Sequence, residues 1–260
     1  MTGEGELIYE TRGACAWLTI NRPDRRNAIN DAVLAGIAAG LERATADDAV
    51  RAIVITGAGE RAFCAGADLA PGSASFARDF SRPSTAFGLL LRQAARTVKP
   101  LVARVNGHCM AGGMGLLSMC DLAVAAEHAI FGLPEVRIGL FPMQVLAVLR
   151  RLVLPRHLDE LCLTGEPIDA LHARTIGLIN HVVPGDGLDA KVDWLLGRLV
   201  DKSPTAHRRG KFAMQAIADM SFEQAIAYLE DQIGTLALTE DAREGQQAFA
   251  EKRAPRWTGR

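Results

Sequence analysis

In the first half of the chain, short continuous apolar runs alternate with segments whose apolar residues have helical spacing. Residues 6–10 and 14–20 are rich in β-forming side chains and are separated by Arg12 and Gly13, which predicts a hairpin. Three further apolar runs predict strands at 51–57, 101–105 and 122–126. Apolar positions three and four apart predict helices at about 30–43, 84–98 and from 112 onward. This alternation predicts an α/β core with mostly parallel strand pairing.

The pattern changes after about residue 143. Helical spacing dominates from there, and only residues 179–183 resemble a strand. No internal repeat or low-complexity linker separates the two parts of the chain. We therefore expect an α/β core over residues 1–195, followed by a helical C-terminal region over residues 196–260.

Composition and charge narrow the class of protein. The chain has 260 residues, of which 49% are hydrophobic and 23% charged, as in ordinary globular proteins. The net charge is −1 and Lys and Arg are scattered, which argues against nucleic acid or an anionic membrane as the main partner. The first residues lack the basic and apolar regions of a secretory signal, and no apolar run is long enough to span a membrane. We expect a cytoplasmic protein.

The cysteines and histidines predict neither disulfides nor a metal site. The five cysteines are odd in number and form no C-x-x-C pair, so we expect buried, reduced thiols. The six histidines have no metal-ligand spacing. Residues 57–62 match a loose dinucleotide pattern, but glycine and proline follow where that pattern must open a helix, so dinucleotide binding is not expected.

Two loops of small residues occupy comparable places, each after an apolar strand. They are "FCAGAD" (63–68) and "NGHCMAGGMG" (106–115). Backbone N–H groups in such loops point outward without obstruction by a side chain, and two of them converging on one oxygen would form an oxyanion hole. The spacing alone leaves an equal alternative, in which both loops are only tight connections between strand and helix.

Glu135 lies among apolar residues in a third segment of the chain. It follows Pro134 in "FGLPEVRIGLFP" (131–142). Burial among such neighbours disfavours the charged form and raises the pKa of the carboxyl group. A general acid and base that works near neutral pH needs such a shift. The alternative is an ordinary surface glutamate beside Arg137.

Five segments of the chain match one known family in order and spacing. They are "NRPDRRNAIN", "IVITGAGERAFCAGADL", "VNGHCMAGGMGLLSMCDLAVAAEHAIFGLPEVRIGLFP", "ARTIGLINHVVP" and "EGQQAFAEKR". From about residue 5 to residue 255 the sequence resembles the enoyl-CoA hydratase/isomerase (crotonase) family.

This resemblance implies a spiral of ββα units with a helical C-terminal trimerisation region, assembled as a homotrimer or as a hexamer made of two trimers. It also implies a coenzyme A thioester as the substrate, with no separate cofactor. By position, the N–H groups of Ala65 and Gly112 would bind the thioester oxygen and stabilise the enolate. Glu135 would be the catalytic acid and base.

The resemblance also places residues along the coenzyme and the acyl group. Residues 65–68 would line the path of the adenine and pantetheine, and Arg22 and Arg26 would lie along the coenzyme. Phe249 and Lys252 match positions that in relatives close the acyl pocket or meet a phosphate, sometimes from the adjacent subunit. Surface or packing roles stay open for these two and for both arginines. The expected binding residues are Arg22, Arg26, Ala65, Gly66, Ala67, Asp68, Gly112, Gly115, Phe249 and Lys252.

The sequence departs from the family pattern at Gly115. A typical hydratase of the family carries a glutamate three residues after the oxyanion-hole glycine and a second one at the position of Glu135. Residues three apart share a face of a helix, so the missing carboxylate would have lain beside the Gly112 amide. Ala111 replaces another glycine, and residues 141–152 differ from the run common in hydratases. Glycine at 115 suggests that space is needed there, for a bulky acyl group or for a water molecule.

Three functions therefore stay open. Hydration of a 2-enoyl-CoA is the commonest activity of the family, and with one carboxyl group Glu135 would take a proton from water and pass it to the α-carbon. Moving a double bond from position 3 to position 2 needs only one carboxyl group, which favours an isomerase as the alternative. A member that binds acyl-CoA with little or no catalysis is the third possibility.

Overall fold

A computed structural model describes residues 5–69 and 79–260. Within them, the larger sheet has six strands in the order β1-β2-β3-β5-β7-β10. Its first two strands pair antiparallel and the others parallel, which confirms the hairpin and the parallel core. The strands are β1 (Leu7–Arg12), β2 (Cys15–Ile20), β3 (Ala52–Gly57), β5 (Leu101–Val105), β7 (Leu122–Ala126) and β10 (His181–Val183).

A second, smaller sheet has the order β4-β6-β8-β9 in the described part of the chain. Its strands are β4 (Ala62–Cys64), β6 (His108–Met110), β8 (Ile130–Gly132) and β9 (Ile168–Asp169). Residues 63–64 and 108–110, which were expected to lie in loops, are therefore parts of strands. Strands of two or three residues are too short for an alternating pattern to reveal them, and they form because neighbouring segments pair with them.

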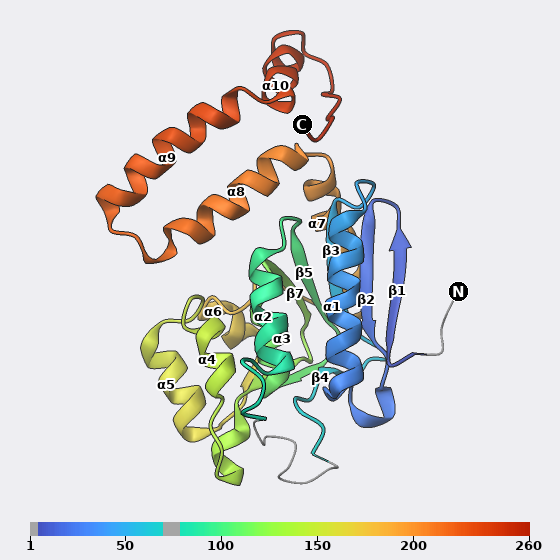
Figure 1. The fold of residues 1–260 in the computed structure, drawn as a ribbon. Helices are drawn as coiled ribbons and strands as arrows, with labels where there is room; N and C mark the ends of the chain where they lie inside the picture. Colours follow the sequence, from blue (N-terminus) through green and yellow to red (C-terminus); the bar gives the residue numbers. More distant parts are fainter. Residues whose placement is uncertain (1–4, 70–78) are drawn as a thin grey trace.

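Strands of the two sheets alternate along the chain. β3 and β4 precede α2 (Ala86–Arg96), and β5 and β6 precede α3 (Gly112–Ser118). In each unit the first strand joins the larger sheet and the second joins the smaller one. This repetition confirms the expected crotonase-like spiral of ββα units (Figure 1).

Helices cover both faces of the larger sheet. Successive side chains of a strand point to opposite faces, and accordingly Leu18 belongs to the main core cluster while Trp17 belongs to a second one. The main cluster includes α1 (Asp31–Ala46), whose first turn is capped by the Asn30 side chain accepting a hydrogen bond from the Val33 N–H at 2.9 Å. The second cluster includes α7 (Leu188–Val200). The expected division after residue 195 falls within α7 and stays a prediction.

Shorter helices follow β8 and continue to β10. They are η3 (Pro134–Ile138), α4 (Met143–Leu149), α5 (Pro155–Thr164) and α6 (Ala170–Thr175). The cysteines at 15, 64, 109, 120 and 162 are all free and buried, as expected. No helix among the described residues is both long and apolar enough to cross a membrane.

The C-terminal region consists of α8 (Pro204–Ala216), α9 (Phe222–Ala237) and α10 (Glu240–Ala250), which lie together beyond one end of the core (Figure 1). Short 3-10 turns are found at Pro23–Arg25, Gly185–Gly187 and Ile217–Asp219. One buried side chain joins α8 to the core: Lys211 Nζ donates to Asp121 Oδ2 at 2.6 Å and to the Lys99 carbonyl oxygen at 2.8 Å. Lys211 is buried and the Asp121 side chain is 35% exposed, so this half-buried ion pair ties α8 to the core.

Candidate active site

Three neighbouring parallel strands of the smaller sheet end at the same edge. β6 pairs with β4 on one side and with β8 on the other, both in parallel. Residues 65–68 follow β4, Gly112 follows β6, and Glu135 comes shortly after β8. The segments expected to carry the chemistry therefore begin side by side at the carboxyl ends of adjacent strands, where α/β sheets commonly bind ligands.

Hydrogen bonds to residues 26–29 decide which N–H groups of the 65–68 loop are free. The Ala65 N–H donates to the Arg26 carbonyl oxygen at 3.0 Å, and the Asp68 N–H donates to the Ile29 carbonyl oxygen at 2.8 Å. The Ala67 N–H has no hydrogen-bond partner among the described residues. The expectation that Ala65 is an oxyanion donor is therefore wrong, because its N–H is already bonded. Ala67 carries the free donor.

Gly112 begins α3 and lies against this loop. Its N–H also has no hydrogen-bond partner within the described part of the chain. A Cβ added to Gly112 would lie 3.8 Å from the Ala67 nitrogen, and one added to Gly66 would lie 3.3 Å from the Gly112 nitrogen. Gly66 has φ +97°, a conformation that other residues rarely adopt. Two free backbone donors, Ala67 and Gly112, are thus brought into proximity.

Ala111 sets the direction of the backbone before Gly112. It has φ 51° and ψ −122° although it is not glycine, and its N–H donates to the Gly132 carbonyl oxygen at 2.9 Å. Such a conformation costs on the order of 1–3 kcal/mol in a residue with a Cβ. Strained backbone persists where the surrounding structure holds it, and here it directly precedes one of the two free donors.

Glu135 lies in η3, directly after Pro134. Its Oε2 atom is buried and has no hydrogen-bond partner among the described residues. Burial raises the pKa of the Glu135 carboxyl group, and the residue's own backbone N–H, which donates to the carboxyl group, opposes the shift. Arg137 pairs instead with Glu166, at 2.6 Å. Glu135 is half-buried with one carboxyl oxygen fully buried, which does not fit an ordinary surface glutamate, and burial acts on its pKa in the expected direction.

The side chain of Cys162, on α5, is close enough to interact electrostatically with Glu135. The pKa of the Cys162 thiol is raised to about 11, mainly by burial and then by Glu135 and Asp159. The thiol is therefore protonated at neutral pH and adds no charge beside the carboxyl group.

Gly115 is not next to empty space. A Cβ at this position would lie 2.7 Å from Cζ of Phe87 and 3.3 Å from Cγ2 of Val145. The expectation that glycine here leaves room for a bulky acyl group or a water molecule is wrong, since the Phe87 ring fills the place of a side chain. No pattern in the sequence indicates this contact, because Phe87 is distant along the chain.

Arg22 is held by the protein itself. Its guanidinium donates to Asp68 Oδ2 at 2.8 Å and to the Ala28 carbonyl oxygen at 2.7 Å, and it lies 3.0 Å from Glu6 Oε1. Its side chain is only 12% exposed. The expected contact of Arg22 with the coenzyme is therefore not supported, and the residue instead ties the 65–68 loop to the segment before α1. The Arg26 side chain is exposed and has no described partner.

Phe249 and Lys252 are not brought to this site within one chain. Phe249 is on α10 and is 88% exposed, and Lys252 follows the end of that helix. The C-terminal helices lie at the opposite end of the molecule from β4 (Figure 1).

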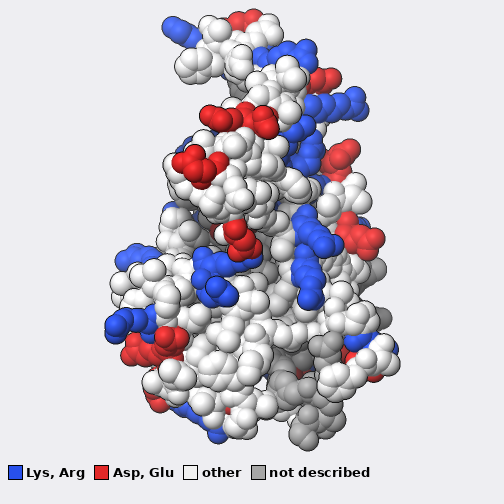
Figure 2. Space-filling view, turned by 60° about the vertical axis from the view of Figure 1, so that its left-hand side comes forward, with Lys and Arg blue, Asp and Glu red and all other residues white. Residues whose placement is uncertain are grey.

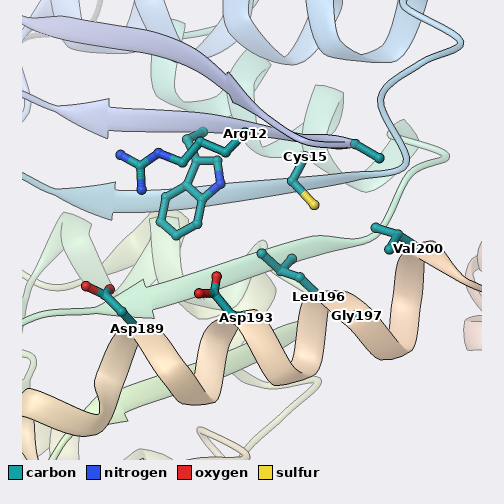
Figure 3. A pocket seen from close by; sticks show the side chains of 9 residues that line it. Arg12, Cys15, Asp189, Asp193, Leu196, Gly197 and Val200 are labelled. Atoms are coloured by element: carbon teal, nitrogen blue, oxygen red, sulfur yellow. The ribbon is translucent and has the colours of Figure 1, made fainter.

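A hollow on the surface lies elsewhere, between the first hairpin and α7 (Figure 3). It is lined by Arg12, Cys15, Asp189 and Asp193, among others. Burial raises the pKa of the Cys15 thiol to about 11, so the thiol is not a nucleophile at neutral pH. This hollow contains none of the candidate catalytic or substrate-binding residues predicted from the sequence.

Charged side chains are dispersed on the face shown in Figure 2, where Lys and Arg alternate with Asp and Glu and form no continuous basic surface. Among residues 5–69 and 79–260, no group of three or more His, Cys, Asp or Glu side chains is placed to hold a metal ion.

Comparison with known proteins agrees with this architecture. The family model described as enoyl-CoA hydratase/isomerase matches residues 10–260. The chain is 36% identical to the crotonyl-CoA hydratase of Syntrophomonas wolfei, over 95% of either chain. It is 35% identical to the 2,3-dehydroadipyl-CoA hydratase of Escherichia coli, over 98% of this chain and 99% of that one. An enoyl-CoA hydratase structure from Mycobacterium smegmatis has a TM-score of 0.89 at 31% identity, covering 98% of this chain and 99% of that one.

The chain therefore belongs to the enoyl-CoA hydratase/isomerase family. Two relatives with nearly equal sequence identity to this chain are named for different acyl groups. Overall sequence identity therefore does not indicate which acyl group this chain binds.

Proposed function

We propose that this protein is an acyl-CoA-processing enzyme that adds water reversibly to a 2-enoyl-CoA. The observation that carries the proposal is the pair of free N–H groups, Ala67 and Gly112, beside a strand that leads to a buried carboxyl group. The two donors bind the thioester oxygen. Negative charge develops on that oxygen when a nucleophile adds to the β-carbon, and preorganised donors in a water-poor site stabilise it.

Glu135 handles both protons of the reaction. As the carboxylate it accepts a proton from water while the water oxygen bonds to the β-carbon, which leaves an enolate on the thioester. The protonated carboxyl group then gives that proton to the α-carbon, the thioester carbonyl re-forms, and the carboxylate is regenerated. A carboxyl group whose pKa is raised toward neutrality is suited to both steps. The reaction needs no separate cofactor, because coenzyme A is part of the substrate.

Isomerisation of a 3-enoyl-CoA to a 2-enoyl-CoA is the second candidate. It is favoured by the Phe87 ring at the place where a second carboxylate would lie. In this reaction Glu135 removes a proton from the α-carbon and returns it to the γ-carbon, while the same two N–H groups stabilise the dienolate. A protein that binds acyl-CoA without turnover is the remaining alternative.

A paired assay on the purified protein separates these functions. We expect crotonyl-CoA to be hydrated, observed as loss of the conjugated enoyl absorbance and formation of the 3-hydroxyacyl product. 3-Hexenoyl-CoA is tested in parallel for appearance of the conjugated product. Isomerisation without hydration would replace the proposal with the second candidate. Binding of both thioesters without any turnover would support the third.

We also propose that the chain works as a homotrimer or as a hexamer of two trimers, with Phe249 and Lys252 reaching the site of a neighbouring copy and Arg26 lying along the coenzyme. None of the 16 residues of α9 is buried, and Phe222 at its start is 76% exposed. A second set of exposed apolar side chains lies on the shorter helices and beside them: Met143, Leu154, Leu163 and Leu171. Two unlike apolar faces suit a head-to-tail contact, which forms a ring when the rotation between copies closes after three of them.

Light scattering is expected to give three or six times the chain mass of 27.9 kDa. Ile233→Glu places a charge on an exposed apolar position of α9 and is expected to lower the mass, whereas Glu230→Gln on the same helix is expected to leave it unchanged. A mass of one chain for the unaltered protein would contradict this assembly.

A further inference from the structure

Phe87 connects two helices with the first turn of α3. Its ring, from α2, lies against Gly115, and Val145, from α4, lies against the same glycine. The ring is partly buried and packs on the main core cluster. Leu89, two residues further along α2, is 55% exposed, so α2 presents Phe87 inward and Leu89 outward.

The position of Gly115 places this ring beside the proposed reaction centre. Gly115 is three residues after Gly112 and on the same face of α3. With a rise of about 1.5 Å per residue, the two lie about 4.5 Å apart along the helix axis. An acyl group that extends along this face of α3, with its carbonyl oxygen held by the Gly112 N–H, would pass close to the ring.

Polar contacts fix the helix that carries Phe87. The Thr85 Oγ1 atom caps α2 by accepting a hydrogen bond from the Gly88 N–H at 3.1 Å. The same oxygen accepts a hydrogen bond from Gln144 Nε2 at 2.5 Å, and Gln144 is the residue before Val145 on α4. The start of α2, which carries Phe87, is thus joined to the start of α4, which carries Val145.

We propose that Phe87 determines acyl specificity by narrowing the pocket next to the thioester, so that the site selects linear over branched acyl groups. This inference rests on the proposed function, because it takes the thioester oxygen to be bound by Gly112. It reverses the reading of Gly115 as an opening for bulky groups: the glycine accommodates the protein's own aromatic ring. A branch at the β-carbon of the acyl group would meet that ring.

Phe87→Ala tests the inference through the ratio of kcat/KM for a branched and a linear substrate. We expect kcat/KM for 3-methylcrotonyl-CoA, relative to crotonyl-CoA, to rise about 10-fold, since one methyl group more or less in an apolar pocket commonly changes discrimination by that order. Leu89→Ala is the matched control on the same helix and is expected to leave the ratio unchanged. Phe87→Leu retains an apolar side chain in the core, and we expect a smaller rise in the same direction.

A binding measurement separates this inference from the proposed reaction. The dissociation constants of butyryl-CoA and 3-methylbutyryl-CoA are measured by calorimetry for the unaltered protein and each variant, and their ratio is expected to shift in favour of the branched ester in Phe87→Ala. If the protein turns over no enoyl-CoA but this ratio shifts, the proposed hydration fails and the role of Phe87 stands. If both ratios stay unchanged in Phe87→Ala and Phe87→Leu, Phe87 is only a packing residue and the inference is overturned.

Discussion

Replacement of Glu135 by glutamine is expected to lower kcat/KM for hydration by about 10²- to 10⁴-fold, the usual contribution of a positioned acid or base. Glutamine keeps the shape of the side chain but neither accepts nor returns a proton. Because the proposed site binds the thioester oxygen through backbone donors, the affinity for butyryl-CoA should change little. Glu127→Gln, at an exposed position, is the control. Activity of Glu135→Gln near that of the control would show that another group moves the protons.

The pH dependence of the unaltered enzyme follows from the buried position of Glu135. Burial raises the pKa of this carboxyl group above the ordinary value of 4.5. In the proposed mechanism, hydration begins with the carboxylate form. Activity is therefore expected to increase with pH through the raised pKa, so the acidic limb of kcat/KM lies at higher pH than for an exposed glutamate. This limb should disappear from the residual activity of Glu135→Gln.

The same burial predicts that Glu135→Gln stabilises the folded protein at neutral pH. The folded state keeps the proton to a higher pH than the unfolded state, so between the two pKa values the free energy of unfolding falls as the pH rises. Above the folded pKa the full cost of the buried charge is present, and glutamine removes it. Thermal unfolding of the two proteins at neutral and acidic pH measures this difference, which should be larger at neutral pH. The trade of stability for activity is typical of catalytic sites.

The sequence was sufficient for the elements whose stability comes from burial. β3 and β7 are continuous apolar runs, and each is buried over most of its length in the structure. β4, β6 and β8 could not be predicted in this way, since they have three residues each and exist because they pair with one another. Those short strands position the candidate site. The sequence therefore indicated the residues of the site more clearly than the strands that hold them.

Three readings of site residues failed because each depended on a contact distant along the chain. Arg22 is bonded to Asp68 and is not left free for the coenzyme. The N–H of Ala65 is bonded by the Arg26 carbonyl, which shifts the free donor to Ala67. The space beside Gly115 is filled by Phe87. The direction of the pKa shift at Glu135 was predicted from the apolar residues beside it in the sequence. The structure shows that two of them, Val136 and Ile138, are exposed, and that Cys162 from α5 lies close enough to the carboxyl group to interact with it. Local causes could be read from the sequence, and tertiary contacts could not.

The oxyanion donor at Gly112 can be tested by comparing two substitutions at one position. Gly112→Ala keeps the N–H, and its Cβ would meet the Ile29 Cδ1 atom at 3.1 Å, the end of a flexible side chain that can shift. Gly112→Pro removes the N–H, and proline is favoured at the first residue of a helix, which is the place of Gly112 in α3. The pair therefore separates loss of the donor from the addition of side-chain atoms.

Gly112→Pro is expected to lower kcat by about 10²- to 10³-fold relative to Gly112→Ala, as loss of one oxyanion donor does in other enzymes. The hydrogen bond is stronger to the enolate oxygen than to the thioester carbonyl, so kcat should fall much more than the affinity for butyryl-CoA. A proline ring that simply blocked the site would weaken butyryl-CoA binding by a similar factor, and that result would assign the loss to obstruction. Equal kcat values for the two variants would mean that Ala67 binds the oxygen without help from Gly112. In that case the strained backbone at Ala111 would only help to pack α3. The expected fall in kcat would instead mean that Ala111 orients the Gly112 N–H toward the thioester oxygen.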